Sequence, residues 1–179
     1  MRYQSEGRMD KKTVTEKMTK KIAVLALLTA CAIIIGYVEA ILPLDLGVPG
    51  IKPGLCNIVI IITLILFTWK EALAVSVIRI LAVGFMFGNL FSISYSMAGT
   101  LFAICIMTLL LNAGRFGLMG ISASGGAMHG IGQMLVAKLV LPALPFAGYA
   151  SVLILSGVIT GALVGLISYE ILKRTRMIV

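Results

Sequence analysis

The chain has 179 residues, of which 60% are hydrophobic and only 12% are charged, and its mean hydropathy is +1.09. So little polar surface cannot enclose a water-soluble core, which excludes the ordinary soluble classes and makes lipid the solvent. A helical span needs about 20 apolar residues to cross a bilayer. The chain therefore has room for about six spans and for no separate globular domain.

The formal net charge of +8 comes mainly from the two ends of the chain, and this pattern argues against a nucleic-acid-binding face. Ten of the 15 Lys and Arg residues lie there: Arg2, Arg8, Lys11, Lys12, Lys17, Lys20, Lys21, Lys173, Arg174 and Arg176. Cytoplasmic flanks of membrane spans are enriched in Lys and Arg. We therefore expect both termini in the cytoplasm, an even number of spans and no nucleic-acid partner.

Three segments are expected in chain order. Residues 1–21 form a polar, basic cytoplasmic tail that is either mobile or the start of an interfacial helix, 22–172 form the transmembrane domain, and 173–179 form a basic cytoplasmic end. The spans are expected at about 22–42, 55–69, 72–90, 92–111, 121–141 and 149–172. The sequence thus predicts an all-α integral membrane protein, a bundle of six transmembrane helices.

The connections between the spans support this topology. Residues 43–54 are rich in Pro and Gly, which interrupt helices, and they form the longest irregular connection, on the outside. Lys70 falls in a tight hairpin and Arg115 in a glycine-rich turn, both expected on the cytoplasmic side. Both cations obey the positive-inside rule.

Polar residues inside the predicted spans are the candidates for function. A charged side chain at the middle of a span costs roughly 2.5–3.5 kcal/mol on insertion scales, so it needs a partner, a water-filled cavity or a role. The candidate binding residues gather toward the outer half of the bundle: Lys52, Asn57, Arg79, Asn89, His129, Gln133 and Lys138. This clustering favours a small polar or anionic ligand that enters from outside.

Two pairs have structural alternatives. His129 and Gln133 share one helical face, where they could line a ligand site, or could pack between helices with His129 bonded to a backbone carbonyl. Glu39 and Arg79 have opposite charge and could pair across the bundle. If they do not pair, Arg79 is the deepest cation and the strongest candidate for binding an anion.

The other candidates also have plain structural interpretations. Lys138 could extend to the external interface, and Lys52 could be a solvated loop charge. Asn57 and Asn89 could cap helices or bond between them. The three cysteines have no disulfide or zinc spacing, and we interpret them as apolar packing residues.

Enzyme signatures are missing from the sequence. It has one histidine, no Cys/His metal spacing, no nucleophile elbow, no phosphate-binding loop and no Asp-rich magnesium motif. We therefore expect no catalytic residues, no metal and no directly bound cofactor. Active transport would need a partner that uses ATP.

Two motifs carry a resemblance to a known family. These are Gly-Ile-Lys-Pro-Gly-Leu-Cys-Asn at 50–57 and His-Gly-Ile-Gly-Gln at 129–133. In these two motifs and in its six-span layout, the chain resembles the Gx transporter family. That family is also labelled heptaprenyl diphosphate synthase component I, and it is similar to the substrate-binding S components of energy-coupling factor (ECF) transporters. The resemblance covers about residues 20–173.

The resemblance implies a function and partners. It implies a multi-pass protein of a bacterial cell membrane that binds a vitamin, a cofactor or an isoprenoid or quinone precursor beneath the loop joining its first two spans. Uptake would then require a transmembrane coupling subunit and two ATPase subunits. The family label leaves an alternative, an accessory membrane component of heptaprenyl diphosphate synthesis or of a quinone or electron-transfer assembly.

The resemblance also implies a surface for docking the coupling subunit. S components use small residues in an Ala-x-x-x-Ala pattern on the first span, and here Ala26 and Ala30 match that pattern, with Ala23 one turn earlier. Small residues at this spacing let helices approach closely. The same residues could instead pack helices within a single bundle.

Overall fold

The computed structural model describes residues 2–41, 54–140 and 146–175, and these residues form six helices and no strands. In chain order they are α1 (Arg2–Ile41), α2 (Cys56–Leu66), α3 (Trp69–Phe87), α4 (Leu90–Ala113), α5 (Leu118–Val140) and α6 (Phe146–Arg174). The predicted all-α, six-helix fold is confirmed.

The helix boundaries follow from local capping chemistry. Before α3, the Thr68 hydroxyl accepts a hydrogen bond from the Lys70 N–H at 3.3 Å, and the Glu71 carboxylate accepts one from the Thr68 N–H at 3.1 Å. This reciprocal capping box satisfies backbone donors that the first turn leaves free. At the far end of α4, Gly114 has φ of +64°, a left-handed conformation that glycine adopts without a Cβ penalty.

Helix α2 differs most from its expected span. The expected span covers residues 55–69, whereas α2 has only 11 residues. It is therefore about 16 Å long, which is roughly half the thickness of the hydrocarbon layer. Phe67 has a non-helical backbone, and the capping box restarts the chain as α3. Ile60 and Ile61 on α2 are fully buried. The apolar sequence of α2 therefore reflects burial inside the protein and not a length that crosses the membrane.

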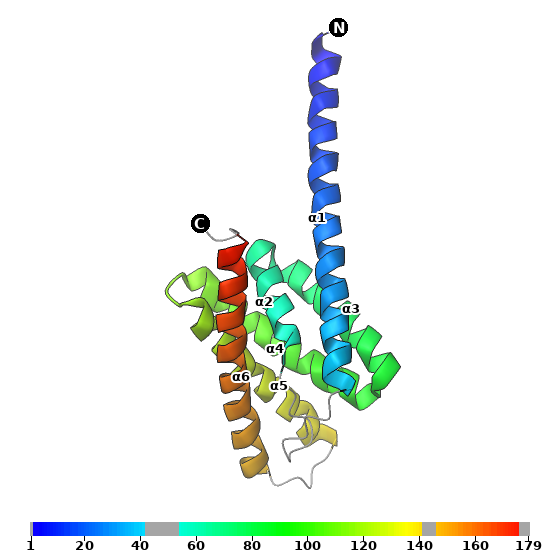
Figure 1. Cartoon of the computed structure of the whole chain (residues 1–179). Helices are drawn as coiled ribbons and strands as arrows, with labels where there is room; N and C mark the ends of the chain where they lie inside the picture. Colours follow the sequence, from blue (N-terminus) through cyan, green and yellow to red (C-terminus); the bar gives the residue numbers. More distant parts are fainter. Residues whose placement is uncertain (1, 42–53, 141–145, 176–179) are drawn as a thin grey trace.

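Three helical segments in the described part of the chain are long and apolar enough to cross a membrane: Thr13–Ile41, Leu90–Ala113 and Gly148–Arg174. Neighbouring helices run up and down, so the Arg2 end of α1 and the Arg174 end of α6 lie toward the same end of the bundle (Figure 1). The final turns of α1, α3 and α5 lie toward the other end. This agrees with an even number of passes. Which end faces the cytoplasm stays a prediction.

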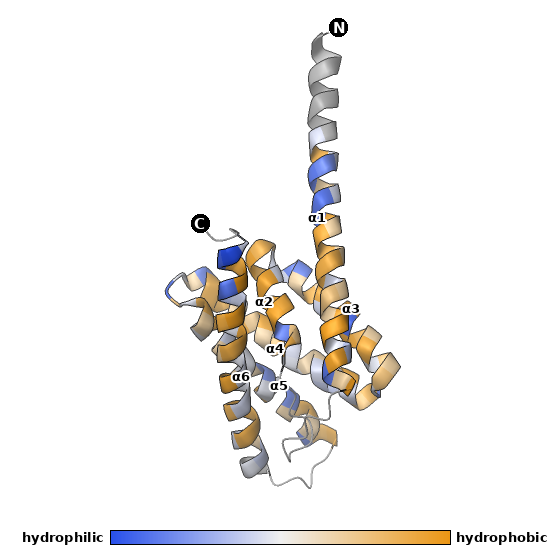
Figure 2. Ribbon diagram, in the orientation of Figure 1, coloured by the Kyte–Doolittle hydropathy of each residue, from blue (hydrophilic) through white to orange (hydrophobic). Residues whose placement is uncertain are grey.

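Helix α1 continues through most of the expected tail and projects beyond the bundle (Figure 1). The hydrophilic residues Lys17 and Lys20 are exposed on this extension, whereas the bundle is mainly hydrophobic (Figure 2). The tail contains no proline and many good helix formers, so the helix that starts in the membrane segment has no reason to stop at residue 21.

The core lies where α2 packs among α1, α3, α4 and α6, and α5 makes its most extensive contacts with α6 and α4. Glycines allow α5 and α6 to cross closely. A methyl group added to Gly126 would lie 1.9 Å from the carbonyl oxygen of Gly157, and one added to Gly161 would lie 2.5 Å from the carbonyl oxygen of Ser122. Backbone contact of this kind is the geometry that small residues permit in membrane helices.

Candidate functional site

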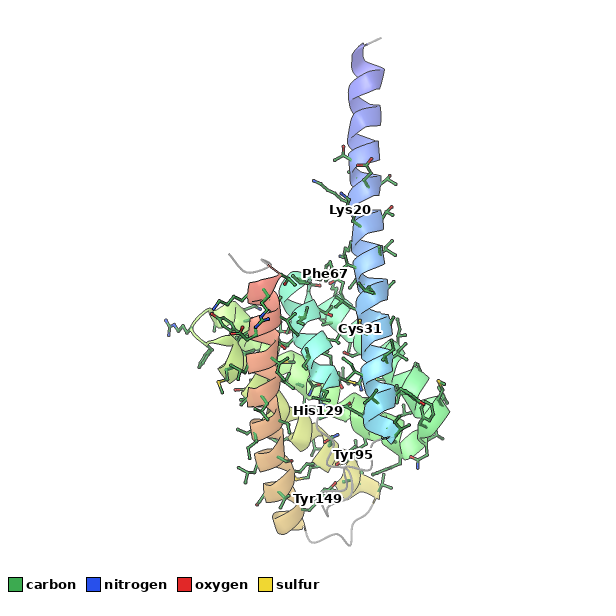
Figure 3. The ribbon with its side chains drawn as sticks, viewed as in Figure 1. Lys20, Cys31, Phe67, Tyr95, His129 and Tyr149 are labelled. Carbon is green, nitrogen blue, oxygen red and sulfur yellow. The ribbon has the colours of Figure 1, made fainter. Side chains whose placement is uncertain are left out.

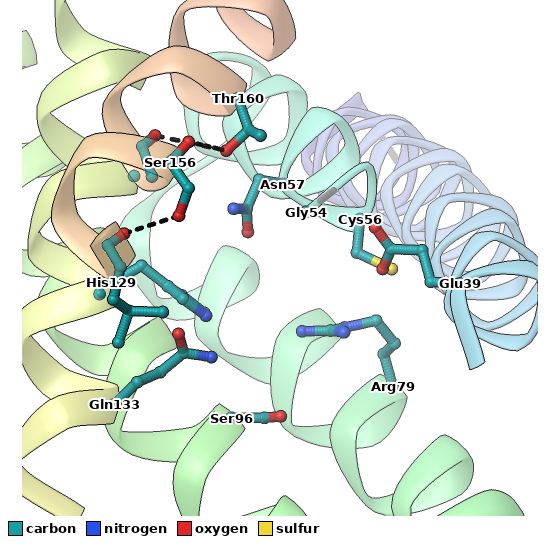
Figure 4. Close-up of a pocket in the computed structure, with 14 residues that line it drawn as sticks. Glu39, Gly54, Cys56, Asn57, Arg79, Ser96, His129, Gln133, Ser156 and Thr160 are labelled. Atoms are coloured by element: carbon teal, nitrogen blue, oxygen red, sulfur yellow. Dashed lines mark hydrogen bonds between the residues drawn. The ribbon is translucent and has the colours of Figure 1, made fainter. Parts of the chain in front are cut away.

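A polar cavity of ≈ 80 Å³ lies in the middle of the bundle, bordered by residues from every described helix (Figure 4). This volume accommodates several water molecules or the polar part of a small ligand. The charged, amide and imidazole side chains that line it are Glu39, Asn57, Arg79, His129 and Gln133. Along the bundle, His129 lies between Phe67 near one end and Tyr149 near the other (Figure 3).

Arg79 on α3 is the cation of this cavity. Its Nε atom is buried and has no hydrogen-bond partner among the described residues. No ion pair between Arg79 and Glu39 occurs in the described structure, although both side chains line the cavity. The structure therefore does not support the pairing alternative, and Arg79 is the cation that borders the central cavity among the described residues.

Glu39, near the end of α1, bonds to the backbone and not to Arg79. Its carboxylate accepts a hydrogen bond from the backbone N–H of Leu55, directly before α2. An anion at this position satisfies a free backbone donor and interacts favourably with the positive end of the α2 dipole. The Cys56 thiol lies within hydrogen-bonding reach of Glu39 and Arg79, and it also donates to the Ala32 carbonyl at 3.5 Å. Cys56 thus packs between the two charged groups.

Helix α5 supplies the opposite wall with His129 and Gln133, which lie one turn apart, as the spacing predicts. His129 hydrogen-bonds to the backbone of Gly99 on α4, and its Nδ1 is buried without a partner among the described residues. The Nε2 atom of His129 faces Gly99 and lies 2.8 Å from the position that a Cβ on Gly99 would occupy. If Nε2 donates to the carbonyl, a neutral ring leaves Nδ1 to accept from a ligand.

Hydroxyl groups complete the wall on α4 and α6. Ser156 donates to the Leu153 carbonyl at 3.0 Å, and Thr160 donates to the Ser156 carbonyl at 2.9 Å (Figure 4). Because their protons go to the helix itself, their oxygen lone pairs remain available as acceptors. Sequence reasoning missed Ser156, Thr160 and Ser96; the i, i+4 spacing of Ser156 and Thr160 on an apolar helix was the available signal.

The structure brings together four of the sequence-predicted binding residues around one cavity: Asn57, Arg79, His129 and Gln133. Asn89 lies elsewhere, because its side chain caps α4 by accepting from the Ser92 N–H at 2.8 Å. Lys138 is exposed near the end of α5 and is not among the residues that line the cavity. Lys52 lies outside the described residues. Ligand binding by these side chains stays a prediction.

The small residues of α1 face outward. Ala23, Ala26 and Ala30 are all exposed, and the neighbouring Leu27 is 64% exposed. Within the described chain these alanines therefore do not serve as buried packing residues of the bundle. Their role in docking a partner stays a prediction.

The chemistry of the cavity is that of polar recognition. It offers one guanidinium, two amides, an imidazole and several hydroxyl oxygens around a carboxylate that already holds a backbone donor. The described residues contain no group of three or more His, Cys, Asp or Glu side chains that could hold a metal ion. Such a donor set fits a small molecule that carries an anionic group and further hydrogen-bonding atoms.

A family model described as heptaprenyl diphosphate synthase component I matches residues 28–171, which include the whole cavity wall. Searches of curated proteins and of solved structures found no match. Since the model covers most of the chain, this protein belongs to the heptaprenyl diphosphate synthase component I family.

Proposed function

We propose that this protein is a membrane-embedded binding subunit that captures a small polar or anionic molecule in the central cavity and passes it inward with an ATP-driven ECF module. The observation that carries the proposal is Arg79, whose buried Nε has no partner in the described structure. A cation within a membrane bundle that has no carboxylate in an ion pair with it is costly, and an anionic ligand would offset that cost.

The surroundings of Arg79 favour a ligand with several polar atoms. Asn57 and Gln133 each present both a donor and an acceptor, and His129 has an unpartnered Nδ1. These side chains come from α2 and α5, so a ligand between them and Arg79 would bridge separate helices. Such convergence of a few polar groups on one cavity is typical of a small-molecule site.

Transport requires an energy source, and the sequence has no phosphate-binding loop of its own. The exposed alanines of α1 offer a surface on which a second helix could approach closely. By resemblance to S components, we assign Ala23, Ala26 and Ala30 to the contact with a coupling subunit that is driven by two ATPases.

A second candidate function follows from the family match. The protein could be an accessory membrane component of heptaprenyl diphosphate synthesis, in which Arg79 would hold a diphosphate group. Affinity purification from native membranes separates the two candidates. Recovery with ATPase and coupling subunits supports transport, whereas recovery with a soluble prenyl synthase and stimulation of its product formation supports the accessory role.

The binding proposal is tested by mass spectrometry of small molecules that co-purify with the protein from native membranes. We expect an anionic compound with the wild type and its loss with Arg79→Gln. Arg115→Gln is the matched control, because Arg115 is exposed between α4 and α5. If the two variants retain the same compounds in equal amounts, Arg79 does not bind the ligand and the proposal fails.

A further inference from the structure

Glu39 and Arg79 stand at the junction of two cavities. A second cavity of ≈ 60 Å³ lies beside the first, between α1, α3 and α4, and Glu39, Arg79 and Ser96 line both. In the described part of the chain, Glu39 and Arg79 are the only acidic, Lys or Arg side chains on either wall. A ligand at the junction therefore meets one carboxylate and one guanidinium.

The charges of Glu39 and Arg79 cancel, and this balance restricts the ligand that the junction can hold. A ligand with a single negative charge would bind Arg79 but would share the site with the buried carboxylate, which leaves one negative charge in excess. An uncompensated charge away from water is costly. A ligand that carries one negative and one positive group would keep the site neutral.

The Glu39 carboxylate has room for a further hydrogen-bond donor. It is buried, it accepts from the Leu55 N–H, and the Cys56 thiol is also within reach of it. A carboxylate offers about four lone-pair sites, so about half of them are left for a ligand. An ammonium group has three N–H donors and no acceptor, and its positive charge matches the carboxylate.

The two charged groups are close enough for one small molecule to reach both. No ion pair joins them in the described structure, but the Cys56 sulfur lies within hydrogen-bonding reach of each. Figure 4 shows Glu39, Cys56 and Arg79 together on one side of the first cavity. A gap that one sulfur atom bridges can also be bridged by a few carbon atoms of a ligand.

We propose that the ligand is a small zwitterion, whose acid group binds Arg79 and whose ammonium group binds Glu39. This inference rests on the proposed function, because it needs the anion site at Arg79. It adds the substrate class: an amino acid or another molecule with a primary amine a few atoms from its acid group. The zwitterion could be free in solution or could be the head group of a lipid.

β-Alanine, propionate and ethylamine are the probes, measured by equilibrium binding to the protein in phosphatidylcholine nanodiscs. Propionate lacks the amine of β-alanine, and ethylamine lacks its carboxylate. Because hydrogen bonds between charged groups are the strong ones, we expect β-alanine to bind the wild type at least about tenfold more tightly than either fragment. Glycine with acetate, and γ-aminobutyrate with butyrate, repeat the comparison at a shorter and a longer spacing.

Removing one charge of the protein should weaken the zwitterion and strengthen one fragment. In Glu39→Gln we expect β-alanine to bind about tenfold more weakly, whereas propionate and methyl phosphate bind more tightly because a like charge is gone. In Arg79→Gln, β-alanine should weaken similarly and ethylamine should bind more tightly. Glu16→Gln, at an exposed position on the same helix as Glu39, is the matched control and should change none of these affinities.

The outcomes separate the two proposals. If the simple acids bind through Arg79 as tightly as the amino acids at all three spacings, the proposed function stands and the zwitterion inference is overturned. A preference for β-alanine that is unchanged in Glu39→Gln also overturns it. If no acid binds the wild type, both proposals fail. The comparison of probes in the wild type needs no variant, so it decides the inference even if Glu39→Gln does not fold.

Phosphatidylethanolamine added to the nanodiscs identifies the source of the zwitterion. Its head group has a primary amine near an acid group, whereas the amine of phosphatidylcholine has no N–H donor. Where the wild type prefers β-alanine, competition by phosphatidylethanolamine supports the inference with the bilayer as the source. The same preference without competition supports it with a ligand from solution.

Discussion

Glu39 and Arg79 line the same cavity, but the Glu39 carboxylate bonds to the backbone N–H of Leu55 and not to the Arg79 guanidinium. The carboxylate thereby anchors the start of α2 to the end of α1. The guanidinium is left facing the cavity with its Nε unpartnered in the described structure. Of the two opposite charges in this site, Glu39 therefore positions α2, whereas Arg79 faces the cavity.

Substitution of Glu39 separates its charge from its hydrogen bond. Glu39→Gln keeps an oxygen that can accept from Leu55 but removes a negative charge near Arg79, so we expect methyl phosphate to bind roughly three- to tenfold more tightly. Glu39→Ala removes the acceptor as well and should lower the free energy of unfolding by about 1–3 kcal/mol. Equal phosphate affinity in wild type and Glu39→Gln would contradict this division of tasks.

Gly99 on α4 should be essential for the shape of the α5 wall. A methyl group at Gly99 would lie 2.8 Å from His129 Nε2 and 2.9 Å from Gln133 Cγ, so Gly99→Ala must displace both side chains. We expect a loss of about 1–3 kcal/mol in the free energy of unfolding, with weaker ligand binding. Gly120→Ala is the control, because a methyl group there meets nothing within 4 Å. Unfolding in detergent and phosphate binding are the measurements.

The crossing of α5 over α6 should tolerate substitution even less. A methyl group on Gly126 would meet the backbone of Gly157, which cannot rotate away as a side chain could. Gly126→Ala should therefore cost at least about 3 kcal/mol of unfolding free energy or prevent folding. Gly148→Ala, which meets nothing within 4 Å, should change the melting temperature little. A normal melting temperature for Gly126→Ala would show that the helices can separate at low cost.

The pair Lys21–Glu71 joins α1 to the first turn of α3, with Nζ and Oε1 2.5 Å apart. The hydrogen bond from Lys21 and, next, that from Thr68 lower the pKa of Glu71 from 4.5 to about 2. Because the folded pKa is depressed, the stabilisation is present above pH 4.5 and is lost as the pH falls toward 2. The wild type should melt above Glu71→Gln at neutral pH, and the gap should close across this window. A gap that does not change with pH would contradict the assignment.

The outward alanines of α1 provide a test of partner docking. Replacing Ala23, Ala26 and Ala30 together with Leu should leave phosphate binding unchanged, because these residues do not line the cavity. If the proposed coupling subunit docks here, the triple variant should no longer co-purify with it, since bulky side chains keep helices apart. Ala74→Leu, at an exposed position on α3, is the control. Undiminished recovery of the coupling subunit with the triple variant would place the docking surface elsewhere.

The helices were predictable from the sequence because apolar length and Pro/Gly interruptions report directly on them. Helix α2 was the exception, since an apolar run looks the same whether lipid or protein surrounds it. Its early end depends on Thr68 and Glu71, whose S/T-x-x-E spacing is the capping-box signature that could have marked the boundary.

The site was predictable only in part. His129 and Gln133 share a face because helical periodicity requires it, and Arg79 stands out as a charge within an apolar helix. The contact of Glu39 with Leu55 joins residues 16 positions apart across the connection that follows α1, and no local pattern encodes it. Asn89 shows the converse, because a polar residue at a helix start is explained by local capping alone.

The shortness of α2 also limits how much apolar helix separates the cavity from one end of the bundle. Asn57 in the first turn of α2 borders the cavity, and about 16 Å of helix separates that turn from the opposite end of α2. That length is roughly half of a 30 Å hydrocarbon layer, so α2 alone is too short to cross it. Beyond Asn57, α2 contributes Ile60, Ile61 and Leu64 to the main apolar cluster of the bundle, so the cavity is closed on that side by packed side chains.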